Sequence, residues 1–384
     1  MDVSPALEGR VLARAPRFDR IAVSSVFGDA RLAGTWSGAP SNVASALERL
    51  GVKVATLMPQ LGRWDKARIA LMQLARGHGR PLSGEQILRS LDARRLHARQ
   101  AAGQAAALGV TRVLHFGTFD LPAVDGDRVE HYLYCDHTWD LSRRHHVHAD
   151  RYTARALADF EEAECLALHD LAHVFTFGAY VRDNLIVHYG LQPDRVTAVG
   201  SGFGGIEPFT GAKDYGRPRL LFVAKHLFRE KGGVLLLEAF ARLRRERRDV
   251  VLTIVGDERS RRFVGSADGV DFRAHLPWRE LQRLYRDSTL LVQPMLNDPW
   301  GQVYLEAMAS RTPVMGLARN GLPELTDGGR HGFLVDRADA DSLARAMLCA
   351  LSDPARLERM AIAGQRYVLG THSWDRVAER MVFP

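Results

Sequence analysis

The sequence predicts an α/β protein built from two doubly wound, Rossmann-like parallel sheets. Short runs rich in β-branched residues alternate with amphipathic stretches along the chain, which is typical of parallel sheets covered by helices. A glycine-rich break at residues 199–205 divides this alternation into two halves. The length of 384 residues, at about 150 residues per domain, also favours two or three domains.

The first half begins with a strand and a glycine-containing loop. Residues 21–26 form this strand, and the loop at 34–40 leads into a helix at 41–50, whose apolar residues recur at helical spacing. The later elements alternate in the same way. We expect strands at residues 52–58, 112–116, 131–135 and 173–177, and helices within 64–108 and at 154–171.

The alternation restarts beyond the break. We expect strands at residues 219–224, 250–255, 290–293 and 313–316, and helices at 233–246, 279–287 and 301–310. The sequence thus predicts an N-terminal domain of residues 1–205 and a C-terminal domain of residues 206–368, with a last helix at about 369–384 that packs back on the first domain. Two such sheets joined by a hinge place a ligand cleft between the carboxyl ends of their strands.

The composition favours anionic partners but does not identify which kind. Fifty-two Lys and Arg against 45 Asp and Glu give a net charge of +7, which favours nucleotides, phospholipid surfaces or nucleic acid. The chain has no run of 18 apolar residues, and its first residues lack the apolar core of a secretory signal, so we expect a cytoplasmic protein. Three separated cysteines without a CxxC spacing indicate neither a disulfide framework nor a zinc site.

Charged residues in the second half follow two of its predicted strands. Lys225 and Lys231 come after strand 219–224, and Asp298 comes after strand 290–293. Glu306 follows Asp298 with seven residues between them, around a Pro-Trp-Gly turn. Carboxyl ends of parallel strands meet at one edge, so we expect these side chains to share the cleft.

The residues between the two carboxylates lie at the start of a predicted helix. Trp300, Gly301 and Gln302 occupy this amino end. The free N–H groups and positive dipole of a helix start suit a phosphate or a sugar oxygen. Further along, Glu324 stands at the start of another short helix, where we expect a capping carboxylate rather than a catalyst.

These segments, in this order, resemble the nucleotide-sugar-binding domain of the retaining GT-B glycosyltransferases of glycosyltransferase family 4. The resemblance covers nearly all of the second half, including residues 222–233, 298–309 and 311–335. It implies the GT-B architecture of two Rossmann-like domains facing each other across a cleft. The chain departs from the family at two positions: Lys225 stands where Arg is usual, and Asp298 stands where Glu is usual.

The resemblance also implies roles for these residues. Lys225 and Lys231 would hold the donor diphosphate and stabilise the departing one, and Glu306 would accept the ribose hydroxyls. Asp298 would contact the donor sugar. Residues 271–284 are similar to the segment whose backbone reads the nucleotide base, around His275 and Leu276.

The first half resembles the family less closely. Gly38, in the loop before helix 41–50, would donate its amide to the diphosphate. Asp136 and His137 directly follow strand 131–135, where the family often places a His or His-Asp pair near the reacting sugar. A hydrogen-bonded turn is the alternative for these two residues, and Glu164 is expected to be structural.

The function implied is retaining transfer of a hexose-type sugar from a nucleoside diphosphate to an acceptor hydroxyl, in bacterial polysaccharide or glycolipid assembly. The acceptor is a saccharide, a lipid-linked or another hydroxyl compound. No metal is expected, because the Asp-Gly-Asp spacing at 125–127 lies in the wrong half. Alternatives are a sugar-nucleotide-binding pseudoenzyme or a GT-B phosphorylase or epimerase. A basic nucleic-acid-binding protein would explain the charge, yet the sequence has no aromatic-basic platform or recognition helix.

The basic stretch at residues 66–99 admits two interpretations. Its apolar residues recur on helical periods, so its charged faces are either simply solvated or form a contact with an acceptor or an anionic membrane surface.

Overall fold

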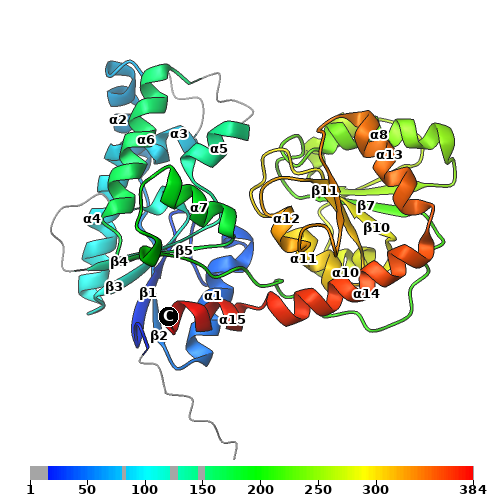
Figure 1. The fold of residues 1–384 in the computed structure, drawn as a ribbon. Helices are drawn as coiled ribbons and strands as arrows, with labels where there is room; N and C mark the ends of the chain where they lie inside the picture. Colours follow the sequence, from blue (N-terminus) through cyan, green and yellow to red (C-terminus); the bar gives the residue numbers. More distant parts are fainter. Residues whose placement is uncertain (1–15, 80–83, 122–128, 146–151, 384) are drawn as a thin grey trace, which may run out of the picture.

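The computed structural model describes residues 16–79, 84–121, 129–145 and 152–383. It contains two six-stranded sheets, in both of which every neighbouring pair of strands is parallel. Helices cover the sheets, and the two domains lie side by side (Figure 1). The predicted fold class is therefore confirmed.

The N-terminal sheet has the strand order β2-β1-β3-β4-β5-β6. Its strand order reverses between β1 and β3, which is where ligands bind in doubly wound sheets. The strands are β1 (Arg20–Ser24), β2 (Lys53–Leu57), β3 (Arg112–Phe116), β4 (Glu130–Cys135), β5 (His173–Thr176) and β6 (Val196–Ala198). Most of their residues are buried, as expected of strands with helices on both faces.

The C-terminal sheet has the order β12-β11-β10-β7-β8-β9 and reverses between β7 and β10. Its strands are β7 (Arg219–Ala224), β8 (Val251–Gly256), β9 (Val270–Ala274), β10 (Leu290–Val292), β11 (Val314–Leu317) and β12 (Phe333–Val335). The loops that follow β7 and β10 thus flank the switch point of this sheet.

The helices predicted at 41–50, 154–171, 233–246, 279–287 and 301–310 agree with the observed ones to within about two residues, whereas the last helix begins at residue 374 rather than about 369. In the N-terminal domain they are α1 (Ala39–Arg49), α2 (Arg63–Ala75), α3 (Gly84–Arg89), α4 (Leu91–Ala107), α5 (Trp139–His145), α6 (Ala154–His169) and α7 (Ala179–Val187). The others are α8 (Gly233–Glu246), α9 (Arg261–Val264), α10 (Trp278–Asp287), α11 (Gln302–Ala309), α12 (Leu322–Leu325), α13 (Ala340–Leu351), α14 (Pro354–Thr371) and α15 (Trp374–Val382). Within the described ranges, no helix is both long and apolar enough to cross a bilayer.

The last helix lies on the N-terminal domain. Helix α14 leads back from the C-terminal domain, and α15 packs against α1 (Figure 1). Arg49 of α1 binds Asp375 of α15 at 2.5 Å, and the backbone N–H of Arg17 donates to the carbonyl of Val382 at 2.7 Å. The chain therefore crosses between the domains twice.

The glycine-rich segment after β6 is anchored, although its composition predicts a free hinge. The phenol of Tyr134 donates to the carbonyl of Gly200 at 2.6 Å, and Arg380 of α15 donates to the carbonyl of Val199 at 3.0 Å. Gly202 packs so closely on Trp374 that a Cβ there would lie 2.5 Å from the indole. Glycine here permits close packing of the segment on α15.

Candidate functional site

An ion pair joins the two loops at the switch point of the C-terminal sheet. The Nζ of Lys231, in the loop after β7, lies 2.5 Å from Oδ2 of Asp298, in the loop after β10. Backbone bonds hold the loops together, since Met295 N–H donates to the carbonyl of Lys231 and Asn297 N–H to that of Glu230. The structure thus brings two predicted catalytic residues into direct contact.

Glu306 lies in α11 and is hydrogen-bonded within the domain. The hydroxyl of Tyr285 donates to its Oε2 at 2.7 Å. Burial raises the pKa of the Glu306 carboxyl, while the Tyr285 bond and the charges of Lys225 and Lys231 act in the opposite direction. A Cβ on Gly204 would lie 3.6 Å from Oε1, so the glycine-rich segment passes close to this carboxylate.

The start of α11 makes two different kinds of contact. Gly301 has φ +81°, and a Cβ there would lie 2.7 Å from the Tyr304 ring, so the turn requires glycine. The side chains of Trp300 and Gln302 point to the other domain: the indole donates to Ser201 Oγ at 2.6 Å, and the Gln302 amide donates to the carbonyl of Gly202. If Trp300 and Gln302 contact a ligand, they would therefore do so through their backbone N–H groups.

Lys225, His275 and Leu276 lie at the carboxyl ends of two strands, β7 and β9, which β8 separates in the sheet. Lys225 follows β7 and is exposed, whereas His275 follows β9 at the edge of the sheet. His275 has φ +49°, and its N–H donates to the carbonyl of Gly256 at 3.3 Å. Leu276 is half-buried against the core. The structure groups Lys225 with Lys231 and Glu306 and places the other two residues farther along the edge.

Gly38 begins α1 at the switch-point side of the N-terminal sheet. It has φ +83°, and a Cβ there would lie 3.2 Å from the carbonyl of Ala33. Trp36 and Ser37 just before it also have positive φ, so this loop turns sharply before the helix. The glycine is required by the turn itself.

Asp136 and His137 lie at the end of β4, facing the C-terminal domain. Burial, and secondarily the charge of Asp298, raise the pKa of the Asp136 carboxyl to about 7. The backbone of Asp136 accepts a hydrogen bond from the Tyr180 hydroxyl at 2.9 Å, and the His137 ring lies 6.5 Å from the Tyr180 ring. Predicted site residues from the two domains are therefore close enough to interact electrostatically.

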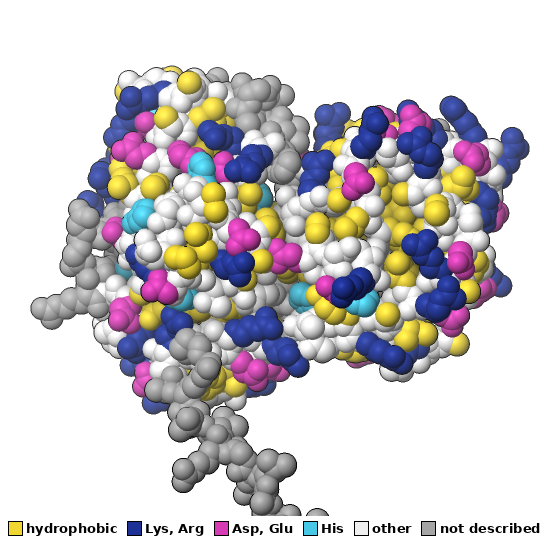
Figure 2. All heavy atoms as spheres, in the orientation of Figure 1, with side chains coloured by type: hydrophobic (Ala, Val, Ile, Leu, Met, Phe, Trp, Pro, Cys, Tyr) yellow, Lys and Arg dark blue, Asp and Glu magenta, His cyan; other side chains and the backbone are white. Residues whose placement is uncertain are grey.

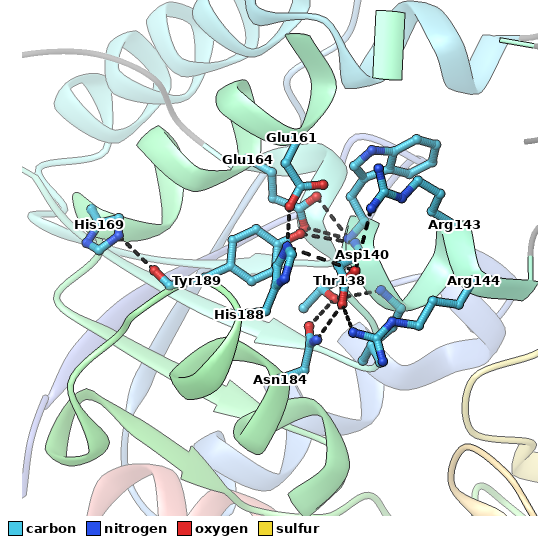
Figure 3. Close-up of polar contacts among 12 residues, drawn as sticks. Thr138, Asp140, Arg143, Arg144, Glu161, Glu164, His169, Asn184, His188 and Tyr189 are labelled. Carbon is cyan, nitrogen blue, oxygen red and sulfur yellow. Dashed lines mark hydrogen bonds and ion pairs between the residues drawn. The ribbon is translucent and has the colours of Figure 1, made fainter. Parts of the chain in front are cut away.

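A buried polar network fixes the segment that follows His137 (Figure 3). Glu164 of α6 accepts the N–H of Trp139 with both carboxylate oxygens, at 3.0 and 3.1 Å, and so caps α5. Thr138 donates to Asn184 at 2.6 Å, and Asn184 donates to Asp140 at 2.7 Å. Glu164 has the structural place expected of it, and the network orients the end of β4.

Sequence reasoning missed the partner of Glu324 and missed Tyr180. Glu324 lies in the first turn of α12, but its carboxylate accepts the N–H groups of Ala179 and Tyr180 in α7 of the other domain, both at 2.7 Å. The only sequence signal was Gly178 before a short helix, which is a common feature. A contact 145 residues apart along the chain leaves no periodicity to detect.

The described residues contain no group of three or more His, Cys, Asp or Glu side chains placed to hold a metal ion. Asp125 and Asp127, which have the Asp-x-Asp spacing, lie outside the described residues.

A cavity of about 200 Å³ lies elsewhere, among α2, α4 and α6. Two ion pairs lie in its walls, since Arg76 binds Asp92 at 2.5 Å and His78 binds Asp159 at 2.6 Å. The switch-point loops, rather than this cavity, gather the residues suited to an anionic ligand.

Residues 208–367 match the family described as Glycosyl transferases group 1. A D-inositol 3-phosphate glycosyltransferase from Streptomyces avermitilis is 36% identical over 115 residues, covering 30% of this chain and 25% of that protein. A GDP-mannose-dependent alpha-(1-6)-phosphatidylinositol monomannoside mannosyltransferase from Mycolicibacterium smegmatis is 30% identical over 179 residues, covering 43% and 47%. The chain thus spans less than half the length of these two relatives.

Solved structures match over nearly the whole chain. Sucrose-phosphate synthase from Thermosynechococcus elongatus has a TM-score of 0.74 at 18% identity, covering 94% of this chain and 97% of that chain. WaaG, a glycosyltransferase involved in lipopolysaccharide biosynthesis, has a TM-score of 0.67 at 15% identity, covering 94% and 99%. These likenesses confirm the GT-B fold.

Asp136→Asn should reduce the pH dependence of stability. The folded protein holds the Asp136 proton with a pKa of about 7, above the ordinary 3.8. This carboxyl therefore makes the free energy of unfolding fall as the pH rises from about 4 to about 7. Urea denaturation should show that the free energy of unfolding of the variant falls by about 2 kcal/mol less than that of the parent across this pH range. This figure allows for solvent screening of a half-buried group.

Asp298→Asn should reduce the pH dependence of the free energy of unfolding by less. It removes only the charge of Asp298, which is the smaller of the two causes of the raised Asp136 pKa. Asp336→Asn, at an exposed position, is the control and should behave like the parent. A parental pH dependence in Asp136→Asn would contradict the half-buried environment of this carboxyl near Asp298.

Proposed function

We propose that the protein is a retaining glycosyltransferase of family 4 that moves a hexose-type sugar from a nucleoside diphosphate to an acceptor hydroxyl. The observation that carries the proposal is the Lys231–Asp298 pair at the switch point, inside the segment that matches Glycosyl transferases group 1. It sets a cation for phosphate and an acceptor for a sugar hydroxyl side by side.

The nucleotide end of the donor would be held by the C-terminal domain. Glu306 would accept the ribose hydroxyls, and the base would contact the backbone near His275 and Leu276. Lys225, Lys231 and the N–H groups at the start of α11 would meet the diphosphate, because cations and a helix amino end both stabilise anionic oxygens. Gly38 would add a backbone N–H from the N-terminal domain.

The transfer itself needs charge stabilisation on the departing phosphate. As the bond from the anomeric carbon to the phosphate oxygen breaks, negative charge builds on that oxygen, where Lys225 and Lys231 would stabilise it. The acceptor oxygen bonds to the same face of the anomeric carbon, and its proton passes to the leaving phosphate oxygen. Asp298 would orient the sugar, and Asp136 and His137 would line the acceptor side.

The relatives suggest the class of acceptor. Two of them are named for an inositol 3-phosphate and for a phosphatidylinositol mannoside, so we propose a polyol or saccharide hydroxyl, carried in some cases on a lipid. A sugar-nucleotide-binding pseudoenzyme, or a phosphorylase or epimerase, remains the alternative. Turnover of donor only when acceptor is present separates a transferase from these.

We also propose that α2 contacts an anionic membrane surface. Three large apolar side chains are exposed on this helix: Trp64 at 76%, Leu71 at 68% and Leu74 at 54%. Their spacing puts them on one stripe, and α2 lies away from the C-terminal domain (Figure 1). Arg63 and Arg68 are exposed beside the stripe, as in helices that bind anionic lipid. Basic side chains elsewhere are spread over both domains on the face in Figure 2, and the cytoplasmic location stays a prediction.

Glu306→Gln should weaken binding of the nucleoside diphosphate by at least about tenfold. The substitution keeps the shape but removes the charge that strengthens bonds to two ribose hydroxyls, a loss of roughly 1.5 to 3 kcal/mol. Calorimetry with the diphosphate of whichever UDP-, GDP- or ADP-sugar supports turnover measures it. Glu280→Gln, exposed at the start of α10, is the control. Parental affinity of Glu306→Gln would refute the nucleotide assignment.

Activity should persist in EDTA, because Lys225, Lys231 and backbone N–H groups would neutralise the diphosphate in place of a divalent cation. Lys231→Ala should lower turnover by ~10- to 100-fold, the range expected when a contact to a transition-state charge is lost. Loss of activity in EDTA with recovery on adding manganese or magnesium would show that the catalytic strategy is different.

Trp64→Ser combined with Leu71→Ser should abolish sedimentation with vesicles that contain phosphatidylglycerol. The parent should bind these vesicles and not pure phosphatidylcholine, because both apolar area and anionic charge contribute. Val187→Ser, which alters an apolar side chain 84% exposed on α7, is the control. Equal binding of the double variant and the parent would show that α2 is simply solvated.

A further inference from the structure

The first turn of α7 is capped by the opposite domain. Gly178 precedes the helix and has no side chain to bond its free N–H groups. Glu324 of the C-terminal domain supplies that cap, with one carboxylate oxygen on the N–H of Ala179 and the other on that of Tyr180, both at 2.7 Å. A carboxylate at a helix start also interacts favourably with the helix dipole.

The side chain of Tyr180 makes a second contact across the same boundary. Its hydroxyl lies 2.8 Å from the carbonyl of Pro299 in the C-terminal domain and 2.9 Å from that of Asp136 in its own domain. Its ring stacks on Trp300, with centroids 6.5 Å apart and planes at 12°. A Cβ on Gly178 would lie 2.7 Å from that indole, so the glycine permits this approach.

These contacts meet the two loops that carry the acidic residues. Pro299 follows Asp298 in the chain, and Asp136 directly follows β4. The Tyr180 hydroxyl therefore contacts the backbone next to the Asp298 carboxylate and the backbone of Asp136 itself. Glu324 grips the same helix turn from α12. Rotation of either domain away from the other would break both Glu324 bonds and the Tyr180–Pro299 bond together, because these bonds join groups of different domains.

We propose that Glu324 and Tyr180 form an interdomain latch that holds the closed arrangement and thereby positions Asp298 against Asp136. They are positioning residues, since their side chains bond protein groups rather than a substrate. When the domains separate, water bonds the Glu324 carboxylate, the Tyr180 hydroxyl and their backbone partners. Each latch bond therefore stabilises the closed arrangement by far less than its strength in the absence of water. Such a latch closes reversibly.

The structural half of this proposal is independent of the proposed function. Small-angle X-ray scattering without ligand should show a larger radius of gyration for Glu324→Gln and for Tyr180→Phe than for the parent. Gln keeps the size of Glu but presents an amide N–H to a backbone donor, and Phe removes only the hydroxyl. Glu238→Gln, exposed on α8, should scatter like the parent. Unchanged scattering from both folded latch variants would overturn the proposal.

The kinetic half rests on the proposed function. If a latch variant leaves one molecule in ten closed, the apparent donor affinity falls about tenfold, and saturating donor should restore much of kcat by selecting the closed form. KM should therefore rise more than kcat falls. Expansion with no change in donor affinity would keep the latch and refute the donor site at the domain boundary. No expansion with a loss of affinity would refute the latch alone.

Discussion

Burial of the Trp300 indole between the two domains is the contact on which their arrangement rests. The ring lies 5.8 Å from that of Phe177 and bonds Ser201, both in or beside the N-terminal sheet. On its other side, a Cβ on Gly321 would lie 2.5 Å from the ring. Because Trp300 also precedes α11, the residue that joins the domains fixes the helix start beside Asp298 and Glu306.

The choice of lysine at the switch point has a physical consequence. Only five of the 52 basic residues are Lys, and Lys225 and Lys231 are two of them. An Arg beside Asp298 would make a planar, two-bond pair with the carboxylate. The Lys231 ammonium makes a single contact on a flexible stem and can turn toward a phosphate without losing its charge. The ion pair thus keeps the Lys231 ammonium near the proposed site and leaves the side chain free to reorient.

Much of the fold was predictable because parallel strands buried on both faces are apolar throughout. The strands at 112–116 and 219–224 were predicted with the observed bounds. The edge strand β6 was missed, because its three residues are too few to show a pattern. The linker was expected to be a free hinge, whereas Gly202 is enclosed by Trp374 and the Gln302 side chain. The glycine content of a segment indicates how freely its backbone can turn, but it does not indicate which side chains pack against the segment in the folded protein.

By itself, the sequence determined the two sheets and the placement of Lys231 and Asp298 in loops that follow strands, because local periodicity and the rule of carboxyl-end sites suffice for these. Only the tertiary structure decided that Lys231 pairs with Asp298, that Asp136 senses Asp298 from another domain, and that Glu324 caps α7. Each of these contacts joins residues 67 or more apart along the chain. Side chains so separated meet only through the packing of whole domains, which no local pattern encodes.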